Sequence, residues 1–167
     1  MNIELVNIDN LTKAEQDAFK RLLKKLTCKS GVYKPKENQN YYFITGDGVV
    51  ECQGWHDDDY DFNCYELGNC FETEEQAEFA YKKQEVYMWL KRYALEHNEK
   101  RINFADNKQS KWCICLEIET DCCLSVVECF NWFDIKQVYF TSKEIAENAI
   151  AEIGEEKIKK YLFEVEE

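Results

Sequence analysis

The sequence has little proline, little glycine and no long apolar run. One proline and six glycines occur among 167 residues, a content that excludes a collagen-like chain, a flexible linker or a disordered tract. No stretch approaches the roughly 18 consecutive apolar residues of a membrane-spanning helix. Residues 1–9 contain acids and no base, unlike the start of a secretory signal. These absences predict a soluble, cytoplasmic protein with no membrane partner.

Residues and motifs for catalysis are equally scarce. The chain has four serines and two histidines, and it lacks a phosphate-binding glycine loop, a G-x-S-x-G elbow and an H-E-x-x-H pair. His56 adjoins Asp57 in a stretch expected to be extended, where neighbouring side chains point apart. His97 ends a predicted helix, where a cation suits the helix dipole. We therefore expect no enzymatic activity and no cofactor.

Nine cysteines are present, an odd number, and no two of them form a C-x-x-C pair. Cys113 and Cys115 stand two apart on one face of a predicted strand, and Cys122 adjoins Cys123. A zinc site is the less favoured interpretation, because only two histidines could complete a ligand set. Buried thiols act as small apolar groups. We expect reduced cysteines and no bound metal.

Positive charge is absent from the middle of the chain. No Lys or Arg occurs from Glu37 to Tyr81, and the twelve acids there equal the net charge of −12. Residues 1–36 carry eight bases and four acids. Binding to phosphates requires bases, so direct nucleic-acid binding is not expected. The acidic segment either confers solubility or docks on a basic partner.

Apolar periodicity and turn residues predict an α+β fold. The expected elements are a helix over about 13–28, strands at 41–45 and 49–53, a helix opening at 71–77 and running to about 97, strands at 112–118, 124–130 and 138–140, a helix opening at 141–144 and running to about 153, and a last helix at 155–163. Three capping boxes begin helices, at Thr12, Thr73 and Thr141. The inward positions expected on the second helix are Ala77, Ala80, Tyr81, Met88, Ala94 and Leu95.

An internal repeat relates the two halves. Residues 49–55 match residues 126–132 at five of seven positions, including Trp55 and Trp132. Downstream, Phe71 and Phe140 each precede a helix that carries Ala-Glu-x-Ala. The predicted fold is therefore a duplicated β-hairpin-plus-helix unit with mainly antiparallel sheet, packed by helices and preceded by an extra N-terminal helix. We assign 1–32 to that helix region, 33–100 to the first unit and 101–167 to the second.

The two copies differ in length at their most acidic point. Trp55 and Phe71 are 16 positions apart, but Trp132 and Phe140 are 8 apart. An insertion that the repeat does without is more typical of function than of folding. The expected partner-binding residues lie in it: Asp57, Asp58, Asp59, Tyr60, Asp61 and Glu66.

Two other interpretations of this insertion remain open. The spacing of Asp57, Asp59 and Asp61 is that of a calcium loop, but Phe62 and Gly68 stand where such a loop needs glycine and glutamate. A weak cation site of another kind is the alternative. The aromatic residues among the acids are either core residues or anchors of a protein interface. They are Trp55, Tyr60, Phe62 and Tyr65.

Several motifs give the chain a family resemblance over about 33–163. They are Tyr33-Lys-Pro-Lys-Glu37, Tyr41-Tyr-Phe-Ile44, the segment from Gly68 to Ala77, Val138–Ala146 and Ala149–Gly154. In these the chain resembles small accessory proteins of phages and prophages of Gram-positive bacteria. It departs from them at Tyr33, where tryptophan is expected, and in its acidic loop. The resemblance implies a phage lineage, and phage proteins of this size include acidic anti-CRISPR inhibitors that block nucleic-acid channels.

Three functions follow as hypotheses. The first is a phage-derived inhibitor that binds a basic, nucleic-acid-handling host protein, such as a CRISPR effector nuclease, by imitating nucleic acid. The second is a phage structural or assembly accessory protein that works by protein contacts. The third is a protein that sequesters a small molecule or nucleotide. The sequence leaves the oligomeric state open, a homodimer included.

Overall fold

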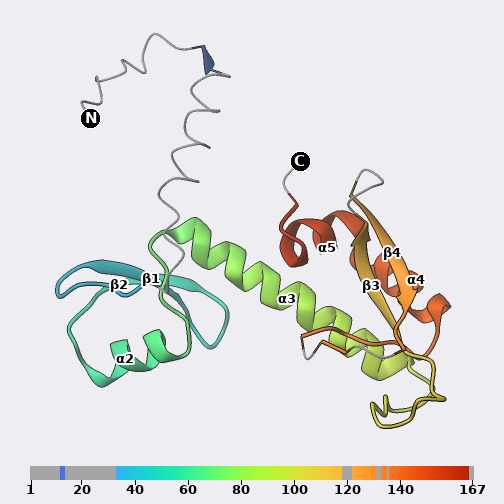
Figure 1. Ribbon diagram of the computed structural model, residues 1–167. Coiled ribbons are helices and arrows are strands. Elements are labelled where there is room, and N and C mark those ends of the chain that lie inside the picture. The colour runs from blue at the N-terminus through green and yellow to red at the C-terminus, as the bar shows by residue number, and fades with distance from the viewer. Residues whose placement is uncertain (1–11, 14–32, 118–121, 131–132, 135, 166–167) are drawn as a thin grey trace, which may run out of the picture. The chain divides into compact units, whose positions relative to one another are not determined.

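The computed structural model describes residues 12–13, 33–117, 122–130, 133–134 and 136–165. The chain divides between Lys34 and Pro35, and Pro35–Glu167 forms one compact unit. Within the described residues this unit has an α+β fold with two antiparallel hairpins and four helices (Figure 1). The helix expected over 13–28 lies outside the described residues, apart from Lys13.

The first hairpin joins β1 (Asn40–Ile44) to β2 (Val50–Gly54). The strands pair antiparallel, with Tyr42 opposite Cys52. Gly48 in the connecting turn has a positive φ of 85°, and a Cβ at this position would meet the ring of Tyr81 at 2.7 Å. Glycine therefore lets the turn reverse and also lets it lie against the following helix.

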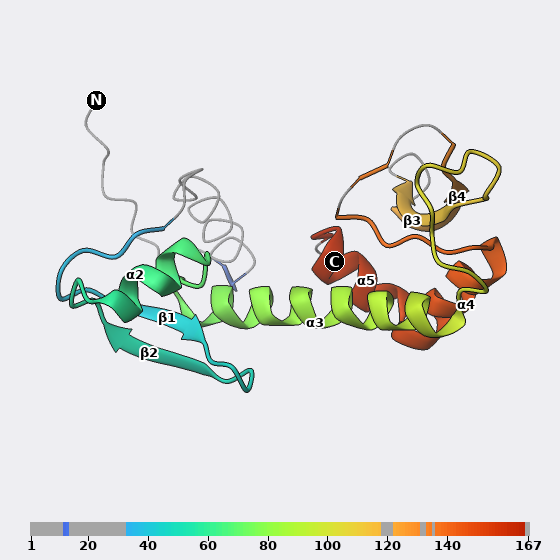
Figure 2. The ribbon, with the colours of Figure 1, turned by 90° about the horizontal axis from the view of Figure 1, so that it is seen from below.

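The stretch after β2 forms a helix, α2 (Asp59–Glu66), where the sequence predicted only a polar connection. Weak apolar periodicity concealed this helix, because Tyr60, Asp61, Phe62 and Cys64 do not form one apolar stripe. The eight positions that distinguish the first copy thus supply room for one short helix beside the β1–β2 hairpin (Figure 2).

The longest helix, α3 (Glu74–His97), links the two hairpins (Figure 2). Its predicted capping box is confirmed: the Thr73 side chain accepts from the Gln76 backbone, and the Gln76 side chain accepts from the Thr73 backbone. The inward prediction is wrong for Leu95, which is 76% exposed. Val86 and Leu90 are buried instead, because the second half of α3 turns that side toward the helices that follow.

The second hairpin joins β3 (Trp112–Glu117) to β4 (Cys123–Glu128), and α4 (Lys143–Ile153) and α5 (Glu155–Leu162) follow. The cap of α4 differs by one residue from the prediction, because Ser142 rather than Thr141 accepts from the Ile145 amide at 3.2 Å. Thr141 instead bonds through its amide to Asn98, beyond the end of α3.

One backbone contact recurs in both halves. Tyr42 of β1 exchanges two backbone hydrogen bonds with Phe71, and Trp112 of β3 does the same with Phe140. The strand expected at 138–140 is reduced to this single bridge. The two repeat copies within Pro35–Glu167 thus share the order hairpin, bridging phenylalanine and capped helix.

The matching sequence segments of the two hairpins do not superpose in register. Cys52 lies opposite Tyr42, whereas Glu128 lies opposite Trp112. The Val-Val-Glu-Cys match therefore slips by one residue when the halves are aligned on their bridges, and one residue exchanges the two faces of a strand. The predicted equivalence of Trp55 and Trp132 is not resolved by the structure, since Trp132 lies outside the described residues.

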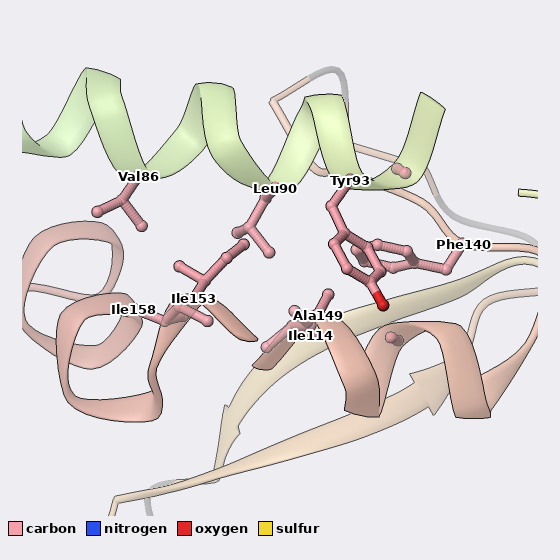
Figure 3. Packing of buried hydrophobic residues seen from close by; sticks show 10 residues of the cluster. Val86, Leu90, Tyr93, Ile114, Phe140, Ala149, Ile153 and Ile158 are labelled. Atoms are coloured by element: carbon pink, nitrogen blue, oxygen red, sulfur yellow. The ribbon is translucent and has the colours of Figure 1, made fainter. Parts of the chain in front are cut away.

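The main hydrophobic core lies between α3 and the second hairpin with the helices that follow it. Figure 3 shows α3 contributing Val86, Leu90 and Tyr93 against Ile153 and Ile158 of α4 and α5. Ile114 of β3 joins the same cluster. The helical spacing of 86, 90 and 93 places these side chains on one side of α3. The halves expected over 33–100 and 101–167 therefore share α3 within one unit.

None of the described helices is both long enough and apolar enough to cross a bilayer.

Candidate functional site

The segment without Lys or Arg displays its acids on the surface. Of the twelve carboxylates between residues 37 and 81, eleven are exposed and one, Asp61, is fully buried. Four exposed acids lie in α2 or just before it. We call these residues, Asp57, Asp58, Asp59 and Glu66, the α2 acidic surface. Sequence and structure agree that this part of the chain carries a concentrated negative charge.

The start of α2 is held by two aspartates. Asp58 is the N-cap, and its carboxylate accepts a hydrogen bond from the Asp61 amide at 2.9 Å. Asp57 has a positive φ of 56° and accepts from the indole nitrogen of buried Trp55 at 2.5 Å. Aspartate tolerates this left-handed conformation better than most residues. The first two acids of the surface therefore have defined positions.

Asp61 lies inside the first unit and differs from the prediction that it contacts a partner. Its carboxylate accepts from the Tyr41 hydroxyl at 2.8 Å, from the His56 amide at 2.5 Å and from the Gln53 side-chain amide at 3.1 Å. These donors come from β1, β2 and the turn before α2. A buried carboxylate needs such partners, and here they join three elements.

Asp61 and Tyr41 share a hydrogen bond, and the electrostatics of this pair keep the negative charge on Asp61. Burial opposes ionisation of Asp61, but hydrogen bonds from His56, Tyr41 and Gln53 outweigh it, so the pKa of Asp61 lies below its ordinary value. Burial, followed by the hydrogen bond to Asp61, raises the pKa of Tyr41 well above that of a free phenol. The proton therefore stays on Tyr41, and Asp61 stays an acceptor.

The aromatic residues of the insertion divide between core and surface. Trp55 is buried and packs edge-on against Phe62, whose side chain is 38% exposed. Tyr60 is 51% exposed, and its ring meets Phe43 edge-on at 5.7 Å. Burial is the first cause that raises the pKa of Tyr60. Tyr60 therefore lies beside Asp59 with its ring packed against Phe43 and about half of its surface exposed to solvent.

The far end of α2 is fixed by an asparagine that the sequence did not single out. Asn69 accepts from the Ile44 amide at 2.9 Å and donates to the Ile44 carbonyl at 2.8 Å. This side chain acts as a strand partner for the end of β1. Leu67, just before it, is 83% exposed, and Gly68 has a positive φ of 70°. Both ends of α2 are therefore anchored to the hairpin.

The outer edge of β2 belongs to the same hairpin to which Asp61 anchors α2. Because Tyr42 bonds to Phe71, its pair with Cys52 is a non-hydrogen-bonded one, and the Cys52 backbone groups point away from β1. No residue in the described ranges pairs with that edge. The corresponding edge of β4 is partly satisfied, since the Leu124 amide bonds to the Glu155 carboxylate, a contact that helps lower the pKa of Glu155 after the larger effect of Lys159.

Sequence reasoning missed two uncharged residues, Tyr41 and Gln53, which bind the charged Asp61. Tyr41 and Gln53 face each other across the hairpin, and both reach Asp61. The sequence offered one indication of these two residues. Each has a polar group at the end of its side chain and lies in a strand that was expected to be half-buried. Asp57, Asp58, Asp59, Tyr60 and Glu66, the other residues predicted to bind a partner, lie on α2 or just before it, and all five are exposed.

The metal alternative finds no ligand set in the described residues. No group of three or more His, Cys, Asp or Glu side chains among them is arranged to hold a metal ion. The calcium-like spacing fails for a structural reason, since Asp61 points inward while Asp59 is exposed on α2.

His97, expected at a helix end, stacks on Tyr93 in the last turn of α3.

Comparison of the chain with protein-family models, with curated proteins and with solved structures gave no match.

Proposed function

We propose that this protein is an acidic docking inhibitor that binds a basic, nucleic-acid-handling host protein through the α2 acidic surface. The observation that carries the proposal is the display of eleven exposed carboxylates in a span without a base. A basic groove made for phosphates attracts such a surface at long range. A CRISPR effector nuclease, whose channels are positively charged, is the class of target that fits both the charge and the phage resemblance.

The anchoring of α2 supports imitation of nucleic acid. Carboxylates replace phosphates effectively only when their positions are set before binding, because ordering them on contact lowers affinity. Asp57 and Asp58 are held by hydrogen bonds, and Asp61 and Asn69 tie the helix to the hairpin at both ends. Tyr60 supplies a half-exposed ring among the acids, in the place that a base has beside phosphates.

The outer edge of β2 adds a second kind of contact. An extended segment of a partner could pair with its backbone, in the manner of strand addition. Glu51 is exposed on β2 and Asp47 in the turn before it, so a segment rich in Lys and Arg is the occupant that fits. A second copy of the chain would place acids against acids.

We further propose that the two units arose by duplication, and that the insertion adapted the first copy for binding. Both copies keep the bridge between a strand and a phenylalanine, followed by a capped helix. The main core joins α3, the helix of the first copy, to the hairpin and helices of the second copy. The helix that the second copy does without carries the acidic surface.

The test is capture of a partner from a Gram-positive host lysate by the wild type and by two variants whose net charges are equal. In the first, Asp57→Asn, Asp58→Asn, Asp59→Asn and Glu66→Gln remove four charges from the α2 acidic surface. Asparagine still caps a helix and accepts from an indole, so the fold should hold. Asp61 stays unchanged because it is buried. A matched control removes four exposed acids elsewhere, with Gln replacing Glu96, Glu99, Glu144 and Glu152.

The wild type and the control should capture the same basic protein at low salt, and the first variant should not. Capture should weaken as salt rises, since exposed charges are screened over about 8 Å at physiological ionic strength. Double-stranded DNA should displace the wild type from the partner. Capture that ignores salt, DNA and the four substitutions would overturn the inhibitor proposal and favour an assembly protein that binds through Tyr60 and Leu67.

A further inference from the structure

Three cysteines gather on one face of the second hairpin, far in sequence from the α2 acidic surface. Cys113 lies on β3 opposite Val127, and the amide of Cys129 bonds to the Lys111 carbonyl at 2.7 Å. Cys129 is therefore the diagonal neighbour of Cys113 on the same face. The two Sγ atoms are 2.8 Å apart, and the Sγ of Cys115 lies 3.8 Å from that of Cys113.

The distance between Cys113 and Cys129 is short for two unbonded sulfurs. Unbonded carbon atoms rest about 3.5–4.0 Å apart, and sulfur is larger. Two thiolates on a tetrahedral zinc, with Zn–S bonds of about 2.3 Å, lie roughly 3.8 Å apart. The separation of 2.8 Å is too small for that arrangement, and the described residues offer no metal ligand group. It approaches instead the bond of about 2.05 Å in a disulfide.

We propose that Cys113 and Cys129 form a redox-active pair that closes to a disulfide when the protein meets a hydroperoxide. The pair lies on the sheet face opposite Ile114, which points toward the helices (Figure 3). Cys129 is half-buried and Cys113 is 4% exposed. A small oxidant therefore reaches Cys129 first.

The chemistry takes two balanced steps. The Cys129 thiolate attacks one oxygen of the hydroperoxide, the O–O bond breaks, and the products are a sulfenic acid and water or an alcohol. Cys113 then attacks the sulfenic sulfur, its proton leaves with the hydroxyl as water, and the S–S bond forms. The two thiols lose two electrons to the hydroperoxide. Burial raises the pKa of the Cys113 thiol, which disfavours its thiolate and leaves the first step to the more accessible Cys129.

Closing the bond would tie the end of β4 to β3. Cys129 begins the segment that leads to Tyr139, a buried residue close to both thiols. Tyr139 packs edge-on with Phe104 and Phe133. The disulfide would restrict the unfolded chain between residues 113 and 129, so the oxidised protein should unfold at a higher urea concentration than the reduced one.

The experiment treats the full-length reduced protein with hydrogen peroxide and maps its peptides without reductant. The wild type should lose two of its nine thiols and yield one linked peptide pair that contains Cys113 and Cys129. Cys129→Ser should lose the linked pair and the shift in urea midpoint. Cys115→Ser is the matched control, and it should keep both.

Three results would overturn the proposal. The first is oxidation of Cys129 to sulfinic acid without a linked peptide. The second is a disulfide at other cysteines, such as exposed Cys52 or Cys123, with Cys113 left reduced. The third is a metal site. Stoichiometric zinc in the reduced wild type that Cys115→Ser abolishes would replace the redox pair with a metal site. The wild-type peptide map decides the question even where a variant fails to fold.

Discussion

Replacement of Asp61 tests whether the acidic insertion is a built structure or a charged loop. Asp61→Asn keeps the size of the side chain and keeps one oxygen for Tyr41 and Gln53. It places an NH2 group where the second oxygen now accepts from the His56 amide at 2.5 Å. A hydrogen bond to a charged group contributes about 1.5–3 kcal/mol. We expect the variant to lose about that much free energy of unfolding.

Asp61→Ala should cost more, because it leaves the Tyr41 hydroxyl and the His56 amide without their acceptor, while the Gln53 side-chain amide keeps the Tyr41 oxygen. Each buried donor that is left without a partner typically costs about 1–3 kcal/mol. A domain of this size has about 5–15 kcal/mol in total, so the alanine variant should approach unfolding at room temperature. Asp59→Asn is the control: Asp59 is exposed, and its replacement should change stability by less than about 0.5 kcal/mol.

The assay is urea unfolding followed by tryptophan fluorescence, with circular dichroism as a second probe. Trp55 is buried within this unit and bonds to Asp57, so it reports on the region directly. Tyr41→Phe removes one donor, and a double-mutant cycle with Asp61→Asn measures their coupling. Equal unfolding free energies for Asp61→Asn and Asp59→Asn would refute the buried network.

Acid titration gives an independent check with a defined sign. The pKa of Asp61 in the folded protein lies below its ordinary value, which is about 3.9 in an unfolded chain. Its ionised form therefore stabilises the fold above about pH 4, and this contribution disappears as the pH falls through the folded pKa. The difference in stability between the wild type and Asp61→Asn should shrink below about pH 4. A constant difference would contradict the assignment.

Three further substitutions probe the rest of the fold by the same urea assay. Gly48→Ala should cost about 1–3 kcal/mol, since its Cβ would meet the Tyr81 ring and its φ is positive; in a Tyr81→Ala background about half of that cost should vanish, and an unchanged cost would assign all of it to the backbone. Ser142→Ala should cost about 1 kcal/mol through loss of the α4 cap, whereas a larger effect of Thr141→Ala would return the cap to Thr141. Lys111→Met should cost about 1–3 kcal/mol, because the Lys111 amino group donates to two backbone carbonyls; a neutral result would show that water replaces it.

Local patterns were enough to predict the hairpins, the three later helices and their order. Strand alternation, the turn around Gly48 and the capping box at Thr73 act over a few residues, so a sequence displays them directly. The concentration of acids between residues 37 and 81 is likewise a property of the sequence alone, and the structure exposes all of them but one.

Tertiary contacts decided the rest. Helix α2 has no clear apolar stripe, and it depends on Asp61, whose donor Tyr41 is 20 residues earlier. Of the four neighbouring aspartates, Asp61 alone is buried, because its carboxylate finds three donors on β1, β2 and the turn before α2. The slip of one residue between the two Val-Val-Glu-Cys segments has the same origin. The slip is visible only when the halves are aligned on the bridges to Phe71 and Phe140, and these bridges join residues far apart in the chain.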